Sequence, residues 1–371
     1  MSTLLKDRYS PAFYEKFSDI LATVIPDFDR KKFTDLIFDE TWNGKELKDR
    51  MKHTSGILHH FMPKDFGLAA FIIESIIEKL KENGISEGGI EFIFFPDYIE
   101  TFGIEHFESS VKSIEYVTQF ISCEFAVRPF IVKYGDQMLN QMIKWSRHES
   151  HHVRRLASEG SRPRLPWAMA LQTLKKNPDP IITILENLKT DPSEYVRRSV
   201  ANSLNDIAKD NPHIVISIAK KWHGSGPETN GIVKHGCRTL LKHGNAEILG
   251  LYGLSASPSL VVSDFLIKSK TVPIGGELMF SFAIQNTDIQ RHSLRLEYTL
   301  YFLRQNGIHG KKVFKISERK LEAGASIQIE KKHSFKVITT RRFYHGIQKL
   351  SIIVNGQERV IGEFELNSIR L

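Results

Sequence analysis

The expected fold of this chain is decided by HHVRRLASEGSRPRLPWAMA at residues 151–170 and by DPSEYVRRSVANSLNDIAKD at residues 191–210. Both segments place an apolar residue and then arginine near the start of an expected helix. The signature occurs at Val127-Arg128, Val153-Arg154-Arg155 and Val196-Arg197-Arg198, with a weaker echo at Val233-Lys234. The steps between the valines are 26, 43 and 37 residues, which is in the range of two- and three-helix solenoid repeats. Stacked repeats would align equivalent arginines along one surface, and such a row of positive charge suits a polyanion.

The remainder of the first 256 residues also has the pattern of helices. The segment SPAFYEKFSDILATVI at residues 10–25 begins with Ser-Pro and then spaces its apolar residues at helical intervals. From residue 109 to 254, prolines stand at expected helix starts and glycines at expected helix ends. The aromatic run FIFFP at 92–96 is expected to be a buried turn or a helix start rather than a strand. We therefore expect an N-terminal α-solenoid over residues 1–256.

The periodicity changes from 3.6 to 2 near residues 255–259. Short segments then alternate apolar and polar residues: LMFSFAIQN, LRLEYTLYFLR, KKVFKIS, SIQIEKKHSFK, QKLSIIV and VIGEFEL. Turn signals separate them, and Asn355-Gly356 between apolar runs is the strongest hairpin signal. Seven or so strands in residues 259–371 predict a small antiparallel β-sandwich of immunoglobulin-like type. Because the Cys-Trp-Cys core of antibody domains is absent, this similarity is one of architecture only.

Charge is distributed unevenly along the 371 residues. Residues 1–120 hold 14 Lys and Arg against 21 Asp and Glu, residues 121–258 hold 19 against 12, and residues 259–371 hold 18 against 10. The first third is therefore acidic, and the other two parts are basic by +7 and +8. An acidic scaffold joined to basic surfaces favours a directed binding face for a polyanion. The alternative is that Lys and Arg only solvate helix exteriors.

Several classes of protein are disfavoured by what the sequence lacks. It has no run of 18 uncharged apolar residues and no apolar signal-peptide core near its start, so we expect a cytoplasmic protein with no membrane partner. Two cysteines are too few for a disulfide framework. The histidines form no HExxH motif, and CxxC, GxGxxG, GxxxxGK[ST] and GxSxG are absent. We therefore expect no metal site, no nucleotide and no other cofactor.

Carboxylates occur among the arginines at helical spacing, which places them on shared helix faces. Three such stripes are Glu124 with Arg128, Arg155 with Glu159, and Arg198 with Asn202 and Asp206. A single pair of this kind is commonly a surface ion pair worth a few tenths of a kcal/mol, and that alternative stays open. Neighbouring repeats would instead bring the stripes side by side on a concave face. Trp167 would be either a core residue or an aromatic wall of that face.

Carboxylates within a phosphate-binding surface suit one kind of chemistry. Cleavage of an N-glycosidic bond develops oxocarbenium character on the sugar, and a nearby carboxylate stabilises that cation and orients water. A base that is already cationic leaves as a neutral molecule and needs no general acid. Carboxylates and DNA-binding arginines would then be nearly sufficient.

At these residues the sequence closely resembles the DNA alkylation-repair glycosylases of the AlkC/AlkD superfamily, specifically the AlkC branch. The resemblance rests on SCEFAVRPFI, HVRRLASEGSRPRLPWA and DPSEYVRRSVANSLNDIAKD, with support from FFPDYIETFGIEHFESS and KELKDRMKH. It covers about residues 1–255, and some members of the family carry a C-terminal immunoglobulin-like domain. It implies HEAT-like repeats that cradle duplex DNA. The implied activity is that of a monofunctional glycosylase releasing N3-methyladenine and N3-methylcytosine.

The resemblance also implies roles for individual residues. Glu159 and Glu124 would be the catalytic carboxylates, and Arg155 would anchor the flanking phosphate backbone. Trp167 would border the lesion, and Asp206 would complete an acidic ring. The expected phosphate contacts are Arg128, Arg162, Arg164, Arg197 and Arg198.

Two further expectations concern DNA binding. We expect the basic β domain to act as a second DNA clamp, with Arg341 and Arg342, just before Phe343, in a loop that reaches a groove. Strand edges protected by lysine are the alternative. A monomer is expected. The competing function is a non-catalytic HEAT-repeat scaffold for DNA or acidic protein, although a scaffold has no use for three carboxylates that repel phosphate.

Overall fold

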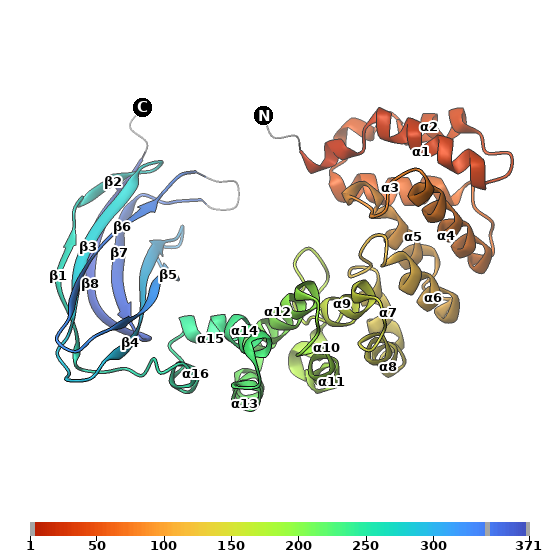
Figure 1. Ribbon diagram of the computed structural model, residues 1–371. Coiled ribbons are helices and arrows are strands. Elements are labelled where there is room, and N and C mark those ends of the chain that lie inside the picture. The colour runs from red at the N-terminus through yellow and green to blue at the C-terminus, as the bar shows by residue number, and fades with distance from the viewer. Residues whose placement is uncertain (1–3, 338–341, 369–371) are drawn as a thin grey trace. The chain divides into compact units, whose positions relative to one another are not determined.

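The computed structural model describes residues 4–337 and 342–368 (Figure 1). Its packing divides the chain into two compact units. The first comprises Met1–Val215 with Gly224–Gly236, and the second comprises Ile216–His223 with Cys237–Leu371. No helix among the described residues is long and apolar enough to cross a membrane.

The first unit is built from helices, as the sequence predicts. They are α1 (Pro11–Val24), α2 (Arg30–Ile37), α3 (Leu47–His59), α4 (Phe66–Glu82), α5 (Phe94–Phe102), α6 (Phe107–Val117), α7 (Val127–Tyr134), α8 (Asp136–Trp145), α9 (His151–Gly160), α10 (Gln172–Lys176), α11 (Asp179–Leu188), α12 (Glu194–Asp210) and α14 (Pro227–Gly236). Short 3₁₀ turns lie at Leu5–Arg8, Trp42–Gly44 and Ile90–Phe92. The aromatic run at 92–96 is thus a turn that leads into a helix. That expectation is confirmed.

Local sequence explains where these helices begin and pack. At α1, the Ser10 hydroxyl accepts a hydrogen bond from Phe13 N at 3.2 Å, and proline follows at the first helical position. The valines of the repeated signature, Val153 and Val196, are fully buried at the starts of α9 and α12. Helix α12 packs against both α9 and α14. The helical repeats therefore stack through the buried valines of the repeated signature.

The second unit combines three short helical segments with two β-sheets. Helix α13 (Pro212–Trp222) crosses the division between the units, and α15 (Arg238–Lys242) and α16 (Ala246–Leu251) precede the strands. The strands are β1 (Leu260–Ile267), β2 (Thr271–Pro273), β3 (Glu277–Asn286), β4 (His292–Leu303), β5 (His309–Leu321), β6 (Ser326–Ser334), β7 (Gly346–Val354) and β8 (Gln357–Asn367). Their order is β1-β3-β6 in one sheet and β2-β8-β7-β4-β5 in the other.

The β-sandwich confirms the expected fold class. All strand pairs are antiparallel except β2 with β8, and the two sheets enclose an apolar core that includes Phe280, Phe282 and Leu296. Asn355 and Gly356 connect β7 to β8, both with positive φ, as a two-residue type I′ turn requires.

This hairpin turn also holds the helical segment before the strands. A Cβ on Gly244 would lie 2.6 Å from Gly356 O, so the two backbones touch only because both residues are glycine. The Asn355 amide donates to the carbonyl oxygens of Ser255 and Ser293, each at 3.0 Å. These contacts explain why residues 237–254 pack with the β-sheets.

Candidate active site

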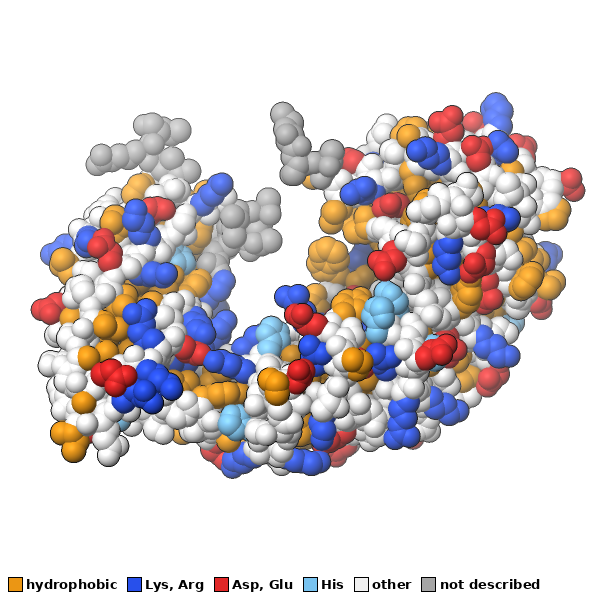
Figure 2. Space-filling model, in the orientation of Figure 1, with side chains coloured by type: hydrophobic (Ala, Val, Ile, Leu, Met, Phe, Trp, Pro, Cys, Tyr) orange, Lys and Arg blue, Asp and Glu red, His pale blue; other side chains and the backbone are white. Residues whose placement is uncertain are grey.

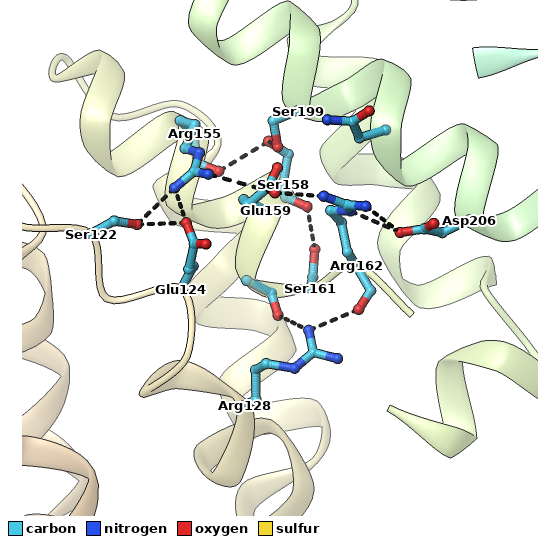
Figure 3. Close-up of polar contacts among 12 residues, drawn as sticks. Ser122, Glu124, Arg128, Arg155, Ser158, Glu159, Ser161, Arg162, Ser199 and Asp206 are labelled. Atoms are coloured by element: carbon cyan, nitrogen blue, oxygen red, sulfur yellow. Dashed lines mark hydrogen bonds and ion pairs between the residues drawn. The ribbon is translucent and has the colours of Figure 1, made fainter. Parts of the chain in front are cut away.

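Three carboxylates and three cations form a continuous row across the first unit, and Figure 3 shows its part from Glu124 to Asp206. Arg155 bridges Glu124 and Glu159, and Arg162 bridges Glu159 and Asp206. Lys209 ends the row against Asp206 at 2.9 Å. The row runs from the segment before α7, across α9 and the loop after it, to α12. The carboxylates of the three expected stripes are therefore brought together. Arg155 with Glu159 is an i,i+4 pair as expected, whereas Arg155 with Glu124 and Arg162 with Asp206 join segments far apart in the sequence.

Glu159 lies at the centre of this row, near the C-terminus of α9. Its Oε1 accepts from Arg162 Nη1 at 2.6 Å and lies 3.5 Å from Arg155 Nη2. Its Oε2 is buried and has no hydrogen-bond partner among the described residues. An unpaired oxygen on a buried carboxylate is costly. The Glu159 carboxylate is therefore a candidate for a group that acts on a ligand.

Close packing fixes the backbone beside Glu159. A Cβ on Gly160 would lie 2.4 Å from Val127 Cγ2, so α9 can end against α7 only with glycine there. Directly before Glu159, Ser158 Oγ is 2.7 Å from Ser199 Oγ of α12 (Figure 3). The carboxylate thus projects from a helix end that is held on two sides.

Arg155 is held between the two expected catalytic carboxylates. Its Nη1 donates to Glu124 Oε2 and, at 2.7 Å, to Ser122 Oγ, while its guanidinium stacks 4.8 Å from the Tyr195 ring centroid. Only 13% of its side chain is exposed, against 19% for Glu124 and 7% for Glu159. Glu124 is therefore the more accessible carboxylate, and Arg155 faces both of them.

Arg162 and Asp206 form the inner end of the row, which corrects their expected roles. Asp206 is 1% exposed and Arg162 is 6% exposed. Burial lowers the pKa of Arg162, but the facing carboxylates of Glu159 and Asp206 outweigh it, so the net pKa is raised. Arg162 is therefore a buried cation that positions Glu159 rather than a phosphate contact. Asp206 lies behind it, too deep to meet a lesion directly.

Arg128 is likewise not a phosphate contact, because its side chain is fully buried. Its guanidinium donates to the carbonyl oxygens of Met169 at 2.7 Å, Gly160 at 2.9 Å and Arg162 at 2.8 Å. Burial, and next the charge of Arg162, lower the pKa of Arg128 to about 10. Arg128 holds the loop after α9 in place.

The first arginine of each doublet in the repeated signature makes the same kind of backbone contact. Arg154 Nη1 donates to the carbonyls of His148 and Glu149, and Arg197 Nη1 donates to those of Asp191 and Pro192. In both repeats the carbonyls lie six and five residues before the arginine. The first arginine of each doublet therefore ties down the preceding loop.

The surface arginines are fewer than the sequence suggests. Arg198 is exposed and lines a pocket with Arg197 and His235. Arg164 pairs with Asp210 through two hydrogen bonds of 2.8 and 2.6 Å, and it is partly exposed. The expected continuous row of surface arginines is wrong: part of it is turned inward as structural ion pairs.

Trp167 is 67% exposed, so it is not a core residue. Its φ of 66° lies in the left-handed region that residues other than glycine seldom adopt. Its backbone carbonyl accepts a hydrogen bond from Lys48. The indole thus projects from a loop whose backbone is constrained.

In the β unit, Arg341 lies outside the described residues. Arg342 is exposed, and its guanidinium lies 5.5 Å from the Tyr344 ring centroid. Figure 2 shows basic side chains with some acidic ones along this unit, and a mixture of acidic and basic side chains over the N-terminal helices. Among the described residues, no group of three or more His, Cys, Asp or Glu side chains could hold a metal ion.

Sequence reasoning missed two residues of this site, Ser122 and Tyr195. A signal for Tyr195 was present, because it directly precedes the valine of the signature, as His152 does in the previous repeat. The side chains of Tyr195 and His152 line one small pocket with Arg155. For Ser122, the sequence offers only its position two residues before Glu124 in the segment SCEF.

Comparison with known proteins agrees with this architecture. The family described as DNA alkylation repair enzyme matches residues 99–235, and the C-terminal Ig-like domain of the uncharacterised protein YhaZ matches residues 261–368. Uncharacterized protein YhaZ of Bacillus subtilis (strain 168) is 39% identical over 98% of this chain and 99% of its own length. The Pseudomonas fluorescens alkylpurine DNA glycosylase AlkC, solved bound to DNA containing an abasic site analog, is 32% identical, with a TM-score of 0.92 over 98% of this chain and 100% of its own. The chain therefore belongs to the DNA alkylation repair enzyme family, in its AlkC branch with a C-terminal immunoglobulin-like domain.

Proposed function

We propose that this protein is a monofunctional DNA glycosylase that hydrolyses the N-glycosidic bond of cationic alkylated bases in duplex DNA. The observation that carries the proposal is the state of Glu159. Its carboxylate is buried, one oxygen is bound by Arg162 and faces Arg155, and the other oxygen has no partner among the described residues. Membership of the DNA alkylation repair family supports this reading.

The proposed mechanism assigns the carboxylates to the sugar. As the bond to the base breaks, positive charge develops on the sugar ring, and a carboxylate fixed nearby stabilises it more than it stabilises the ground state. Glu124, the more accessible carboxylate, and Glu159 behind it would share this role through Arg155. Either carboxylate could orient the attacking water. A base such as N3-methyladenine or N3-methylcytosine leaves as a neutral molecule, so the reaction needs no general acid.

The cations prepare the site for this step. Arg162 is held between Glu159 and Asp206 by contacts of 2.6 and 2.8 Å, so it holds the Glu159 carboxylate in one orientation. Arg155 faces both catalytic carboxylates and is partly exposed, so we propose that it also contacts the phosphate backbone beside the lesion. The exposed indole of Trp167 would border the lesion.

We also propose a division of labour between the segments. Residues 1–256 would form the glycosylase domain, and residues 259–371 would form a DNA clamp, with Arg198, Arg164 and Arg342 among the phosphate contacts. The excess of basic residues in 259–371 supports the clamp. The protein would act as a monomer.

Release of the free base tests the proposed reaction. Purified protein is incubated with methylated duplex DNA in the presence of a chelator and without nucleotide, and released N3-methyladenine is separated by chromatography. Release above the spontaneous rate is expected. Tight, salt-dependent DNA binding without any release would instead support the non-catalytic scaffold.

A further inference from the structure

The loop after α9 carries Trp167 in an unfavourable backbone conformation. The residue has a φ of 66°, and its side chain is largely exposed. A bulky residue stays in the left-handed region only when its surroundings hold it there, and such positions cluster at functional sites. The contacts that hold this loop therefore indicate how the indole is presented.

One anchor comes from inside the helical unit. Arg128 binds the carbonyls of Gly160, Arg162 and Met169, which lie on both sides of Trp167 along the chain. These contacts fix the two ends of the loop. They leave the carbonyl of Trp167 itself to another partner.

The second anchor is Lys48, from a segment 119 residues away. Its ammonium donates to the carbonyl oxygen of Trp167 and lies 5.7 Å from the ring centroid of Phe125, the neighbour of Glu124. Lys48 is exposed and occupies the second position of α3. One side chain thus touches both the Trp167 loop and the segment that carries a catalytic carboxylate.

We propose that Lys48 is a positioning residue for Trp167. Its contact with the carbonyl selects the left-handed conformation of the loop tip. Its contact with Phe125 connects that tip to the segment that carries Glu124. The effect on base excision rests on the proposed glycosylase function, whereas the effect on the loop does not.

The substitution Lys48→Met removes the donor and keeps a long apolar side chain. Lys52→Met is the matched control, because Lys52 is an exposed lysine on the same helix that faces Asp97 and, like Lys48, the charge of Glu100. Lys48→Arg keeps a charged donor and should preserve the contact. The first readout is fluorine NMR of protein labelled with 5-fluorotryptophan, with the Trp167 resonance assigned as the one lost in Trp167→Phe. The other tryptophans, Trp42, Trp145 and Trp222, are buried and serve as internal references.

We expect Lys48→Met to shift or broaden the Trp167 resonance alone, with Lys48→Arg and Lys52→Met close to wild type. The single-turnover rate of base release should fall about tenfold in Lys48→Met, because small misplacements of a contacting group are costly. The dissociation constant for DNA should change no more than in Lys52→Met. An unchanged Trp167 resonance in Lys48→Met would overturn the proposal, as would equal changes in Lys48→Arg and Lys48→Met. If the wild-type protein released no base, the proposed function would fail while the NMR result still decided the role of Lys48.

Discussion

Replacement of Arg128 by methionine should strongly destabilise the helical unit, although the sequence places this arginine among the phosphate contacts. The guanidinium is fully buried and makes three hydrogen bonds to backbone carbonyls. Methionine is of comparable length but donates nothing. The substitution therefore leaves the carbonyls of Gly160, Arg162 and Met169 without their donor.

The size of the effect follows from these contacts. A hydrogen bond to a charged group contributes about 1.5–3 kcal/mol net. Three of them exceed the relief gained by removing a buried charge, which burial already disfavours, as the lowered pKa of Arg128 shows. The net loss should be about 3–5 kcal/mol, the range seen when one partner of a buried charged network is removed. That is a large share of the stability of a typical domain, about 5–15 kcal/mol.

The assay is urea unfolding followed by helical circular dichroism. The control Arg147→Met removes an exposed arginine between α8 and α9 and should change stability by no more than about 0.5 kcal/mol. Arg128→Lys should fall between wild type and Arg128→Met, because one ammonium cannot reach all three carbonyls with the geometry of a guanidinium. An Arg128→Met protein with the unfolding midpoint of Arg147→Met would refute the assignment. A selective loss of DNA affinity would restore the role expected from sequence.

Three further predictions concern other parts of the molecule. Burial, followed by the charge of Asp97, raises the pKa of Glu100 to about 7 from 4.5. Between these two pH values the unfolded chain loses the Glu100 proton while the folded protein keeps it, so the wild type should lose stability relative to Glu100→Gln as pH rises. Above about pH 7 the difference in stability between the two proteins should stay constant. A difference in melting temperature that does not vary with pH would contradict this. Lys311 and Lys312 are exposed neighbours on β5 of the proposed DNA clamp. If both neutralise phosphates, Lys311→Gln with Lys312→Gln should lower the magnitude of the slope of log affinity against log salt by about 2; an unchanged slope would place DNA elsewhere. Asp206→Asn weakens a buried partner of Arg162, so the free energy of unfolding measured in urea should fall by on the order of 3 kcal/mol, and wild-type stability would show that this ion pair is dispensable.

The repeat signature predicted the helical fold because its valines determine packing. Val153 and Val196 are fully buried, and the arginine after each one ties down the loop before its helix. A local sequence pattern can encode both of these roles, since they depend on residues within about one helical turn or loop. The grouping of Glu124, Glu159 and Asp206 was predictable for a different reason, because stacked repeats bring equivalent positions of neighbouring repeats side by side.

The direction of the arginine side chains was not predictable. Arg128, Arg162 and Arg198 stand at similar places in expected helices or their ends, yet the first two are buried and the third is exposed. The difference depends on which carbonyls and carboxylates from distant segments meet each guanidinium. Such contacts span 32 to 44 residues and carry no local signal.

Strand β1 was also missing from the strands recognised by alternation. Its pairing with β3 shifts register between Ser263 and Leu266, and Asp264 has a φ of 51°. The bulge breaks the period-2 pattern on which sequence recognition depends. The remaining long strands alternate regularly enough to be identified, and the Asn355-Gly356 turn has the expected geometry.

The central claim is that the Glu159 carboxylate accelerates cleavage of the N-glycosidic bond. The most direct test is the single-turnover rate of N3-methyladenine release by Glu159→Gln, beside Glu149→Gln as a control at an exposed carboxylate near the start of the same helix. The loss of a preorganised charge at the transition state should slow release by about 10²–10³-fold. Affinity for DNA should be retained, and Glu149→Gln should release base at the wild-type rate. Full activity in Glu159→Gln would contradict the account.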